Sequence, residues 1–292
     1  MKGGATKSVW RKVRRSDGRT IFRYRSAVLG DTLEVTVVAP VAAATGTAAA
    51  SDDRAPALYV LDPFLTLDTV VGWSRVYGRY AEGAVPPAFV IGIGHATDDD
   101  AGFSARRIRD LTPTAVTGRE WTPPLGAGQG PLLLAAIADE IAPFVEANFP
   151  VGRDRTVIGW SLGGLFALTA LFHRPEIFSR YLIVGPSLWW EDRLPAVWEK
   201  AWAAAHDDLP ARVFLAVGSE EEAPGGGWLS EGFSDEIIAW FRQVTNFRAF
   251  TRALRARKYP SLRLDSVVFP GEYHMTVYPA AVARGLVKLF ER

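Results

Sequence analysis

The chain has 292 residues, with 33 basic against 32 acidic side chains, 48% hydrophobic residues and no cysteine. This composition is typical of a globular protein, and the length suffices for one large α/β domain or two smaller ones. A net charge of +1 gives no reason to expect nucleic acid as a partner. The lack of cysteine excludes disulfide scaffolds, cysteine nucleophiles and thiolate metal sites, and it fits a reducing compartment.

Basic residues gather between positions 1 and 15, but no apolar segment of the signal-peptide type follows them. We therefore expect a solvated basic tail over residues 1–19 rather than a targeting or phosphate-binding arm. No stretch approaches the roughly 18 consecutive apolar residues that a membrane span needs. The protein is expected in the cytoplasm, without a membrane partner, and the sequence leaves its oligomeric state open.

The first predicted elements are two strands, over residues 20–28 and 32–39, in which apolar and polar side chains alternate. Gly30 and Asp31 form the predicted turn between them. Residues 41–56 have no apolar period, which predicts a long surface loop. The N-terminal strands are therefore expected to pair in antiparallel fashion before the main sheet begins.

Short, nearly continuous apolar runs follow, each suited to a strand that helices cover on both faces. These runs are residues 57–61, 88–93, 156–159, 181–184, 212–217 and 264–269. Helices are predicted over residues 132–148, 162–173, 231–259 (in one piece or two) and 279–291. The alternation predicts one α/β domain over residues 20–292, with a mostly parallel, doubly wound sheet and helices on both faces.

Two loops rich in proline and glycine, residues 112–131 and 220–232, follow strands in the predicted order. Both therefore lie at the carboxyl end of the predicted sheet, where α/β proteins bind their ligands. An equally good interpretation is that they are ordinary surface loops.

The most informative segment is Gly159-Trp160-Ser161-Leu162-Gly163, which stands between a β-branched apolar run and an apolar helical segment. In this context GxSxG forms a sharp strand-to-helix turn that lifts the serine Oγ above the sheet. The glycines let the strand and the helix approach closely, and the helix N-terminus favours developing negative charge. We therefore interpret Ser161 as a nucleophile rather than as part of a simple tight turn.

A nucleophilic serine needs a base, and the chain has four histidines. His173 lies about 18 Å from Ser161 along the same predicted helix, too far to reach it. His206 stands in a polar segment, and His95 follows a strand where a structural or substrate contact is the better interpretation. His274 follows the last apolar run, so it fits the order serine, acid, histidine of hydrolases with this turn.

The acid of such a triad is expected just after the run 212–217, where the sequence reads Gly218-Ser219-Glu220-Glu221-Glu222. The acid commonly stands three residues after a glycine that ends the strand, which points to Glu221. Glu220 and Glu222 stay open as alternatives, and so does a solvated loop without a catalytic role. The acid would hold the imidazole tautomer and stabilise the imidazolium.

The chain resembles the Putative esterase family of α/β-hydrolases, and within it the esterases of siderophore trilactones such as enterobactin and bacillibactin. Residues 107–113, Arg-x-x-Asp-Leu-Thr-Pro, and 186–190, Pro-Ser-Leu-Trp-Trp, carry the most specific part of this resemblance. The other matching blocks are residues 58–62, 91–94, 159–168, 217–221 and 272–274. The resemblance implies an α/β-hydrolase fold.

The resemblance also implies Ser161 as nucleophile and His274 as general base and acid, in agreement with the residues alone. One oxyanion donor is then the amide of Leu162, which follows the nucleophile. The second donor in relatives comes from the loop where this chain has Pro63, which has no N–H. We therefore expect the amide of Phe64, or another amide nearby, to replace it.

Six residues are expected to bind the substrate, since arginine suits oxygen-rich anions and tryptophan can wall an acyl pocket. They are Arg106, Arg107, Arg109, Trp160, Trp189 and Trp190. The alternative for the arginines is an ion pair with Asp110 that orders the loop, and for the tryptophans it is simple packing.

The sequence thus predicts a serine esterase that works through an acyl-enzyme, with a small-molecule ester as its partner. Ferric siderophore trilactones are the first expected substrates. The alternatives are acetyl or feruloyl esters of carbohydrates, acyl transfer to an alcohol, and a binding protein without activity. No cofactor or metal is expected, because no cluster of ligands has suitable spacing.

Overall fold

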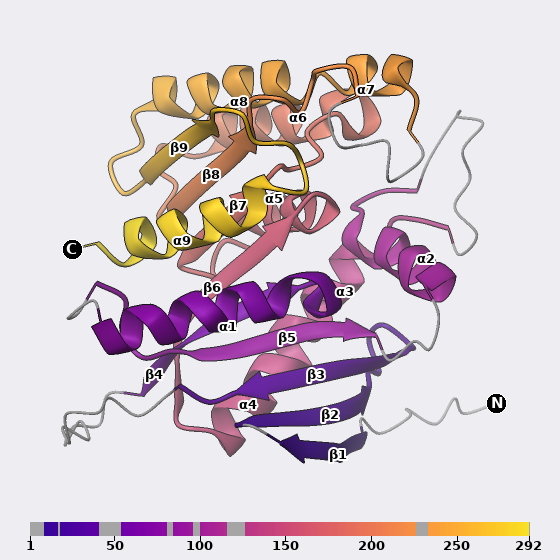
Figure 1. The fold of residues 1–292 in the computed structure, drawn as a ribbon, viewed down its shortest axis with the longest axis vertical. Helices are drawn as coiled ribbons and strands as arrows, with labels where there is room; N and C mark the ends of the chain where they lie inside the picture. The colour runs from indigo at the N-terminus through magenta and orange to yellow at the C-terminus, as the bar shows by residue number, and fades with distance from the viewer. Residues whose placement is uncertain are drawn as a thin grey trace. The chain divides into compact units, whose positions relative to one another are not determined.

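Figure 1 shows the computed structural model, which describes residues 9–16, 18–40, 54–80, 84–95, 100–115, 126–225 and 233–291. Most of the predicted loop 41–56, and parts of the loops 112–131 and 220–232, lie outside these ranges. The chain divides into two compact units, residues 1–155 and 156–292. The prediction of one domain over residues 20–292 stays a prediction.

The first unit pairs its strands in the order β1-β2-β3-β5-β4, antiparallel except for the parallel pair β4–β5. Its elements are β1 (Val9–Ser16), β2 (Arg19–Arg25), β3 (Thr32–Val38), β4 (Ala55–Leu61), α1 (Pro63–Tyr80), β5 (Phe89–His95), α2 (Asp100–Leu111), α3 (Gly130–Ala136), a π-helical turn (Ile137–Ile141) and α4 (Ala142–Asn148). The boundary of the two units falls within the next strand, β6 (Val151–Trp160).

Strands β4 and β5 are the most buried part of this unit, because helices cover both of their faces. Residues 57–61 of β4 and 89–93 of β5 are all buried, as their unbroken apolar sequences predict. Figure 1 shows α1 in front of these strands, and the helical run from α3 to α4 passes behind the sheet. In β3, Leu33, Val35 and Val37 are buried as the sequence pattern predicts, but Thr36 is buried as well, so the alternation ends halfway along the strand.

The prediction of a basic tail over residues 1–19 is wrong for the residues that form β1. Trp10 gives the physical reason, because its ring stacks on Tyr24 at 4.1 Å and on Phe144 of α4 at 3.6 Å. The burial of this ring adds the strand to the sheet edge. Lys12 and Arg14 are exposed on either side of a bulge, so the charge of the segment is solvated even though its backbone is ordered in the sheet.

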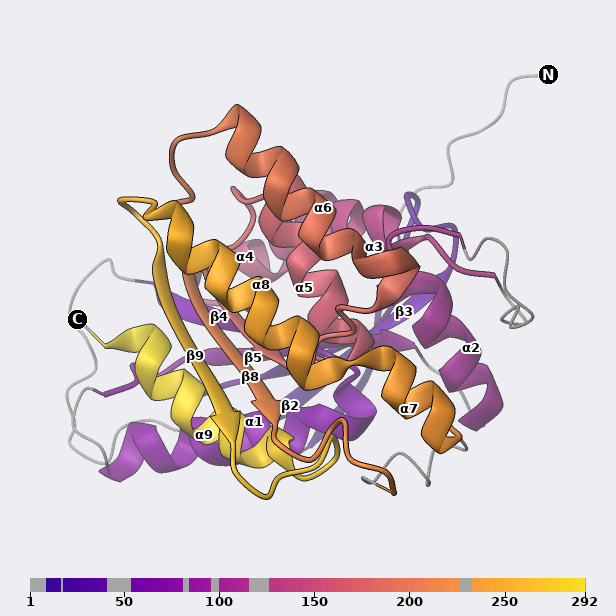
Figure 2. The ribbon, with the colours of Figure 1, turned by 90° about the horizontal axis from the view of Figure 1, so that it is seen from above.

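The second unit has a sheet of parallel strands in the order β6-β7-β8-β9. Its further elements are α5 (Leu162–His173), β7 (Arg180–Val184), α6 (Trp190–Ala205), β8 (Arg212–Gly218), α7 (Asp235–Phe241), α8 (Gln243–Arg257), β9 (Arg263–Phe269) and α9 (Val277–Phe290). Helix α9 covers one face, whereas α5, α6 and α8 lie on the other, with α6 and α8 side by side (Figure 2).

The strand pairings confirm the predicted mostly parallel sheet with antiparallel strands at the N-terminus. Helix α5 has the predicted bounds, and all of its residues from Leu162 to Phe172 are buried. The predicted helix 231–259 is two helices, since Arg242 has a left-handed backbone (φ 47°) between α7 and α8. Within the described ranges, no helix combines the length and apolar character required to cross a bilayer.

Replacing Trp10 by alanine tests whether β1 is held by its aromatic stack. We expect Trp10→Ala to lower the free energy of unfolding by about 2–3 kcal/mol, because it removes a large ring packed between two others. Val13→Ala in the same strand is the control, since that side chain is 47% exposed. Urea unfolding measures both variants, and equal stability of Trp10→Ala and wild type would contradict the role of the stack.

Candidate active site

The nucleophile turn stands between β6, which ends at Trp160, and α5, which begins at Leu162. Ser161 has a strained backbone, with φ 60° and ψ −118°. The turn is tight enough that a Cβ at Gly159 would lie 2.0 Å from the carbonyl oxygen of Gly163. Only glycine fits at that position, so the two elements approach as the sequence motif predicts.

The loop after β7 holds this turn in place. The amide of Ser161 donates to the carbonyl of Val184 (2.9 Å), and the amide of Ser187 donates to the carbonyl of Ser161 (3.2 Å). A Cβ at Gly164 would be 3.0 Å from the Cα of Pro186, so α5 and the loop are in close contact. Ser161 is therefore fixed from the strand on one side and from this loop on the other.

His274 and Glu221 form a buried pair in the same unit. The imidazole Nδ1 lies 2.6 Å from Oε2 of Glu221, and the two side chains are 1% and 0% exposed. The other carboxylate oxygen, Oε1, accepts a hydrogen bond from the amide of Gly218 (2.7 Å). Since a carboxylate accepts, Nδ1 carries the proton, and the neutral ring then has its lone pair on Nε2.

The geometry distinguishes among the three glutamates after β8. Glu220 accepts from the hydroxyl of Ser219 (2.7 Å), and Glu222 accepts from the amide and hydroxyl of Thr245 (2.9 and 3.0 Å). Glu221 alone of the three contacts His274 among the described interactions. The position three residues after Gly218 is therefore the one that meets the histidine.

Gly185, the first residue after β7, is a site residue that sequence reasoning did not single out. Its backbone has a positive φ of 48°, and a Cβ there would lie 2.8 Å from Cε1 and Nδ1 of His274 and 3.2 Å from Oε2 of Glu221. The loop it begins thus contacts the histidine–glutamate pair, while Ser187 two residues later binds Ser161. The sequence feature that could have indicated this site residue is a glycine that directly follows a buried strand and precedes the Pro-Ser block.

The other three histidines lie elsewhere. His173 ends α5 against the edge of Trp198 (5.0 Å), and burial lowers its pKa. His206 is exposed and stacks on Trp202 (3.8 Å). His95, in the first unit, has Nε2 2.6 Å from Oδ2 of Asp110, which agrees with a structural contact.

The three predicted substrate tryptophans have different surroundings. Trp160 is 7% exposed, and its ring lies against the imidazole of His274 at a centroid distance of 4.9 Å. Trp190 is 2% exposed. Trp189 is half-buried and stacks on Phe241 of α7 at 4.1 Å. Of the three, Trp189 has the most accessible ring and follows the loop that binds Ser161.

The three arginines predicted to bind the substrate have ion-pair contacts of different closeness. Arg109 binds both carboxylate oxygens of Asp110 (2.7 and 2.8 Å) and one of Asp31 (2.8 Å). Arg107 donates from Nε to Asp62 (2.9 Å). Arg106 is about one third exposed, and its Nε lies 3.7 Å from Asp31. The ion-pair alternative thus describes Arg109 best, whereas the contact of Arg106 with Asp31 is the longest of these.

Two backbone amides were predicted as oxyanion donors, one in each unit. Leu162 is the first residue of α5 and Phe64 stands in the first turn of α1, where N–H groups have no partner within the helix. Asp62, the residue before α1, has a left-handed backbone (φ 53°), and its carbonyl accepts from the amides of Leu65 and Thr66 (2.9 and 3.1 Å). Burial raises the pKa of the Asp62 carboxyl above its usual value, and the nearby Arg107 offsets only part of this rise.

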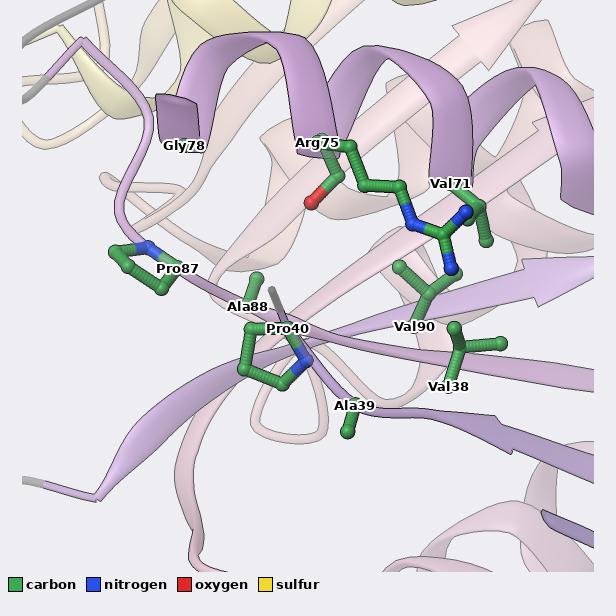
Figure 3. A pocket seen from close by; sticks show the side chains of 10 residues that line it. Val38, Ala39, Pro40, Val71, Arg75, Gly78, Pro87, Ala88 and Val90 are labelled. Carbon is green, nitrogen blue, oxygen red and sulfur yellow. The ribbon is translucent and has the colours of Figure 1, made fainter. Parts of the chain in front are cut away.

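Among the described residues of the first unit, small hollows lie at both ends of β5. One, at the amino end of β5, is mostly apolar, with Arg75 reaching toward it from α1 (Figure 3). The other contains Gly94 and His95 at the carboxyl end of β5, together with Arg106 and Arg107. Because α/β sheets bind ligands at the carboxyl ends of their strands, the second hollow is the better ligand candidate. Among the described residues, no three His, Asp or Glu side chains gather as a metal site.

A strained serine between strand and helix, with a buried histidine–glutamate pair in the same unit, is the arrangement of a serine hydrolase. A family model described as Putative esterase matches residues 26–226, and the chain belongs to this family. The family resemblance found in the sequence is thereby confirmed. The protein is a serine esterase.

Individual relatives agree with this assignment. The ferri-bacillibactin esterase BesA of Bacillus subtilis is 30% identical over 245 residues, which are 79% of this chain and 77% of that protein. The siderophore triacetylfusarinine C esterase of Aspergillus fumigatus is 31% identical over 250 residues, 81% and 82% of the two chains. The crystal structure of the BES protein from Bacillus cereus has a TM-score of 0.77 at 23% identity, covering 97% of this chain and 100% of its own. This likeness confirms the predicted α/β-hydrolase fold.

Replacing Gly185 by alanine tests whether this loop fixes the histidine–glutamate pair. We expect Gly185→Ala to lower kcat for a p-nitrophenyl ester at least tenfold, because the methyl group would displace His274 or Glu221. Gly225→Ala is the matched control, since Gly225 also has a positive φ (73°) but open space around it. Equal activities of the two variants would contradict the role of Gly185.

Proposed function

We propose that Ser161, His274 and Glu221 form the catalytic triad of this esterase. The observation that carries the proposal is the buried 2.6 Å contact between His274 and Glu221. It supports a neutral imidazole whose Nε2 is available as a base, with the strained turn presenting Ser161 as the nucleophile.

In the first half of the reaction, Oγ of Ser161 attacks the ester carbonyl carbon while Nε2 of His274 takes the hydroxyl proton. Glu221 stabilises the imidazolium that forms. The tetrahedral intermediate collapses as the C–O bond to the alcohol breaks, and His274 gives its proton to the leaving oxygen. Water then attacks the acyl-enzyme with His274 again as base, which releases the carboxylic acid and restores Ser161.

The oxyanion needs amide donors that are in place before charge develops. The amide of Leu162 supports one such assignment, since it stands at the N-terminus of α5 directly after the nucleophile. The amide of Phe64 remains our second donor, an assignment that rests on the resemblance of its loop to that of relatives.

For the substrate, we propose an ester of a ferric siderophore, with trilactones first. Both curated relatives named above are siderophore esterases, and three arginines in one helix, α2, give this chain cations suited to an oxygen-rich anion. Arg106 is the strongest candidate contact, because Arg107 and Arg109 are held more closely by carboxylates. Trp189 is the best placed of the tryptophans to meet an acyl group. The cytoplasmic location expected from the sequence stays a prediction.

Substitutions at the three glutamates test the triad. We expect Glu221→Gln to lower kcat by about 10³–10⁴, since the amide cannot stabilise the imidazolium and can favour the wrong tautomer. Glu222→Gln should keep the wild-type rate, because that carboxylate binds Thr245 instead. Ser161→Ala and His274→Ala should lose ester hydrolysis. Wild-type hydrolysis by both of these last two variants would refute the mechanism.

Replacing Arg106 tests the substrate. Arg106→Gln should raise KM for a ferric catecholate trilactone about tenfold or more, through the loss of a charged contact, and leave the kinetics of a neutral p-nitrophenyl ester unchanged. Chromatography of the ring-opened product provides the assay. Cleavage of acetylated or feruloylated sugars without trilactone cleavage would favour the carbohydrate esterase instead.

A further inference from the structure

Trp160 makes two contacts with the histidine that neither the motif nor the relatives assign. Its indole Nε1 donates a hydrogen bond to the backbone carbonyl of His274 (3.1 Å). Its ring also packs against the imidazole, with centroids 4.9 Å apart and planes inclined by 31°. One side chain therefore holds both the main chain and the ring of the same residue.

The surroundings of Trp160 argue against the substrate contact expected from the sequence. The residue is 7% exposed, and its N–H, the polar group that a substrate could use, is already bound to a carbonyl. On α9, Tyr278 approaches the indole at 6.2 Å, and Tyr278 is itself 5% exposed. The indole thus packs between the histidine loop and α9.

The position of Trp160 in the chain gives these contacts a consequence for the reaction. Trp160 is the last residue of β6 and is covalently joined to Ser161, whereas His274 lies in the loop between β9 and α9. Glu221 binds Nδ1 of the imidazole, and Gly185 lies beside the same edge of the ring. The hydrogen bond from Trp160 to the carbonyl of His274 therefore connects the strand that ends at the nucleophile with the loop that holds the base. It fixes the position of the imidazole relative to Ser161.

We propose that Trp160 is a positioning residue, which holds His274 in the orientation that proton transfer from Ser161 requires. The proposal rests on the proposed triad, and it replaces the expected substrate contact of Trp160. Small displacements of a base strongly reduce the rate of a step that needs near-contact geometry. Loss of the contacts between Trp160 and His274 therefore lowers kcat, while substrate binding is unchanged.

The chain offers a matched control in the same unit. Trp202 on α6 also donates its indole N–H to a backbone carbonyl, that of Asp208 (3.0 Å), and also stacks on a histidine, His206, at 3.8 Å. Neither of these partners belongs to the proposed triad. Trp202→Phe therefore reproduces the chemical change of Trp160→Phe, with the loss of one indole hydrogen bond and part of a ring contact, away from the reacting groups.

The test compares wild type, Trp160→Phe and Trp202→Phe with a p-nitrophenyl ester and by proton NMR. A short histidine–carboxylate hydrogen bond gives a low-field Nδ1–H resonance, which His274→Ala identifies by its loss. We expect Trp160→Phe to lower kcat about tenfold with KM within twofold of wild type, and to shift or broaden this resonance. Trp202→Phe should change neither.

Three results would overturn the proposal. If Trp160→Phe raises KM and leaves kcat unchanged, Trp160 is a substrate contact. If its kinetics equal those of wild type, Trp160 has no role in positioning. If kcat falls while the Nδ1–H resonance is unaltered, the effect does not act through His274. If Trp160→Phe does not fold, benzothienylalanine at position 160 removes the N–H and keeps the ring shape, with the same expected result. Hydrolysis by His274→Ala at the wild-type rate would instead refute the triad itself.

Discussion

The buried hydrogen bond between His274 and Glu221 is the interaction on which the rest of the second unit depends. A carboxylate at 0% exposure is costly unless it is hydrogen-bonded on several sides, and here the Gly218 amide and the imidazole provide those bonds. The surrounding backbone accommodates the pair closely, since Gly185 leaves no room for a side chain beside it. The loops after β7, β8 and β9 therefore meet at one hydrogen-bonded pair.

Two strained backbone positions lie where chemistry is proposed. Ser161 has a positive φ, and so does Asp62 at the start of α1, although neither is glycine. Such conformations cost about 1–3 kcal/mol each and persist only where neighbouring contacts enforce them. For Ser161 those contacts are the hydrogen bonds to Val184 and Ser187, and for Asp62 they are the bonds of its carbonyl to the first turn of α1.

Features with a local physical cause could be predicted from the sequence. Unbroken apolar runs predicted the central strands, and α5 was predicted with its observed bounds because its residues from Leu162 to Phe172 are all apolar or small. Features that depend on contacts between distant parts of the chain were harder to predict. The strand β1 depends on Trp10 stacking with residues far along the chain, and three left-handed residues, Glu191 to Arg193, interrupt α6 just after its start without a local pattern that indicates them. The surroundings of Trp160 likewise depend on a loop more than 100 residues away.

The central claim is that His274 activates Ser161 for covalent reaction, and intact-protein mass spectrometry after treatment with a fluorophosphonate tests it most directly. The account predicts one adduct on wild type, mapped to Ser161 by peptide sequencing, no adduct on Ser161→Ala, and strongly slowed labelling of His274→Ala. Labelling of another residue, or labelling of His274→Ala at the wild-type rate, would contradict it.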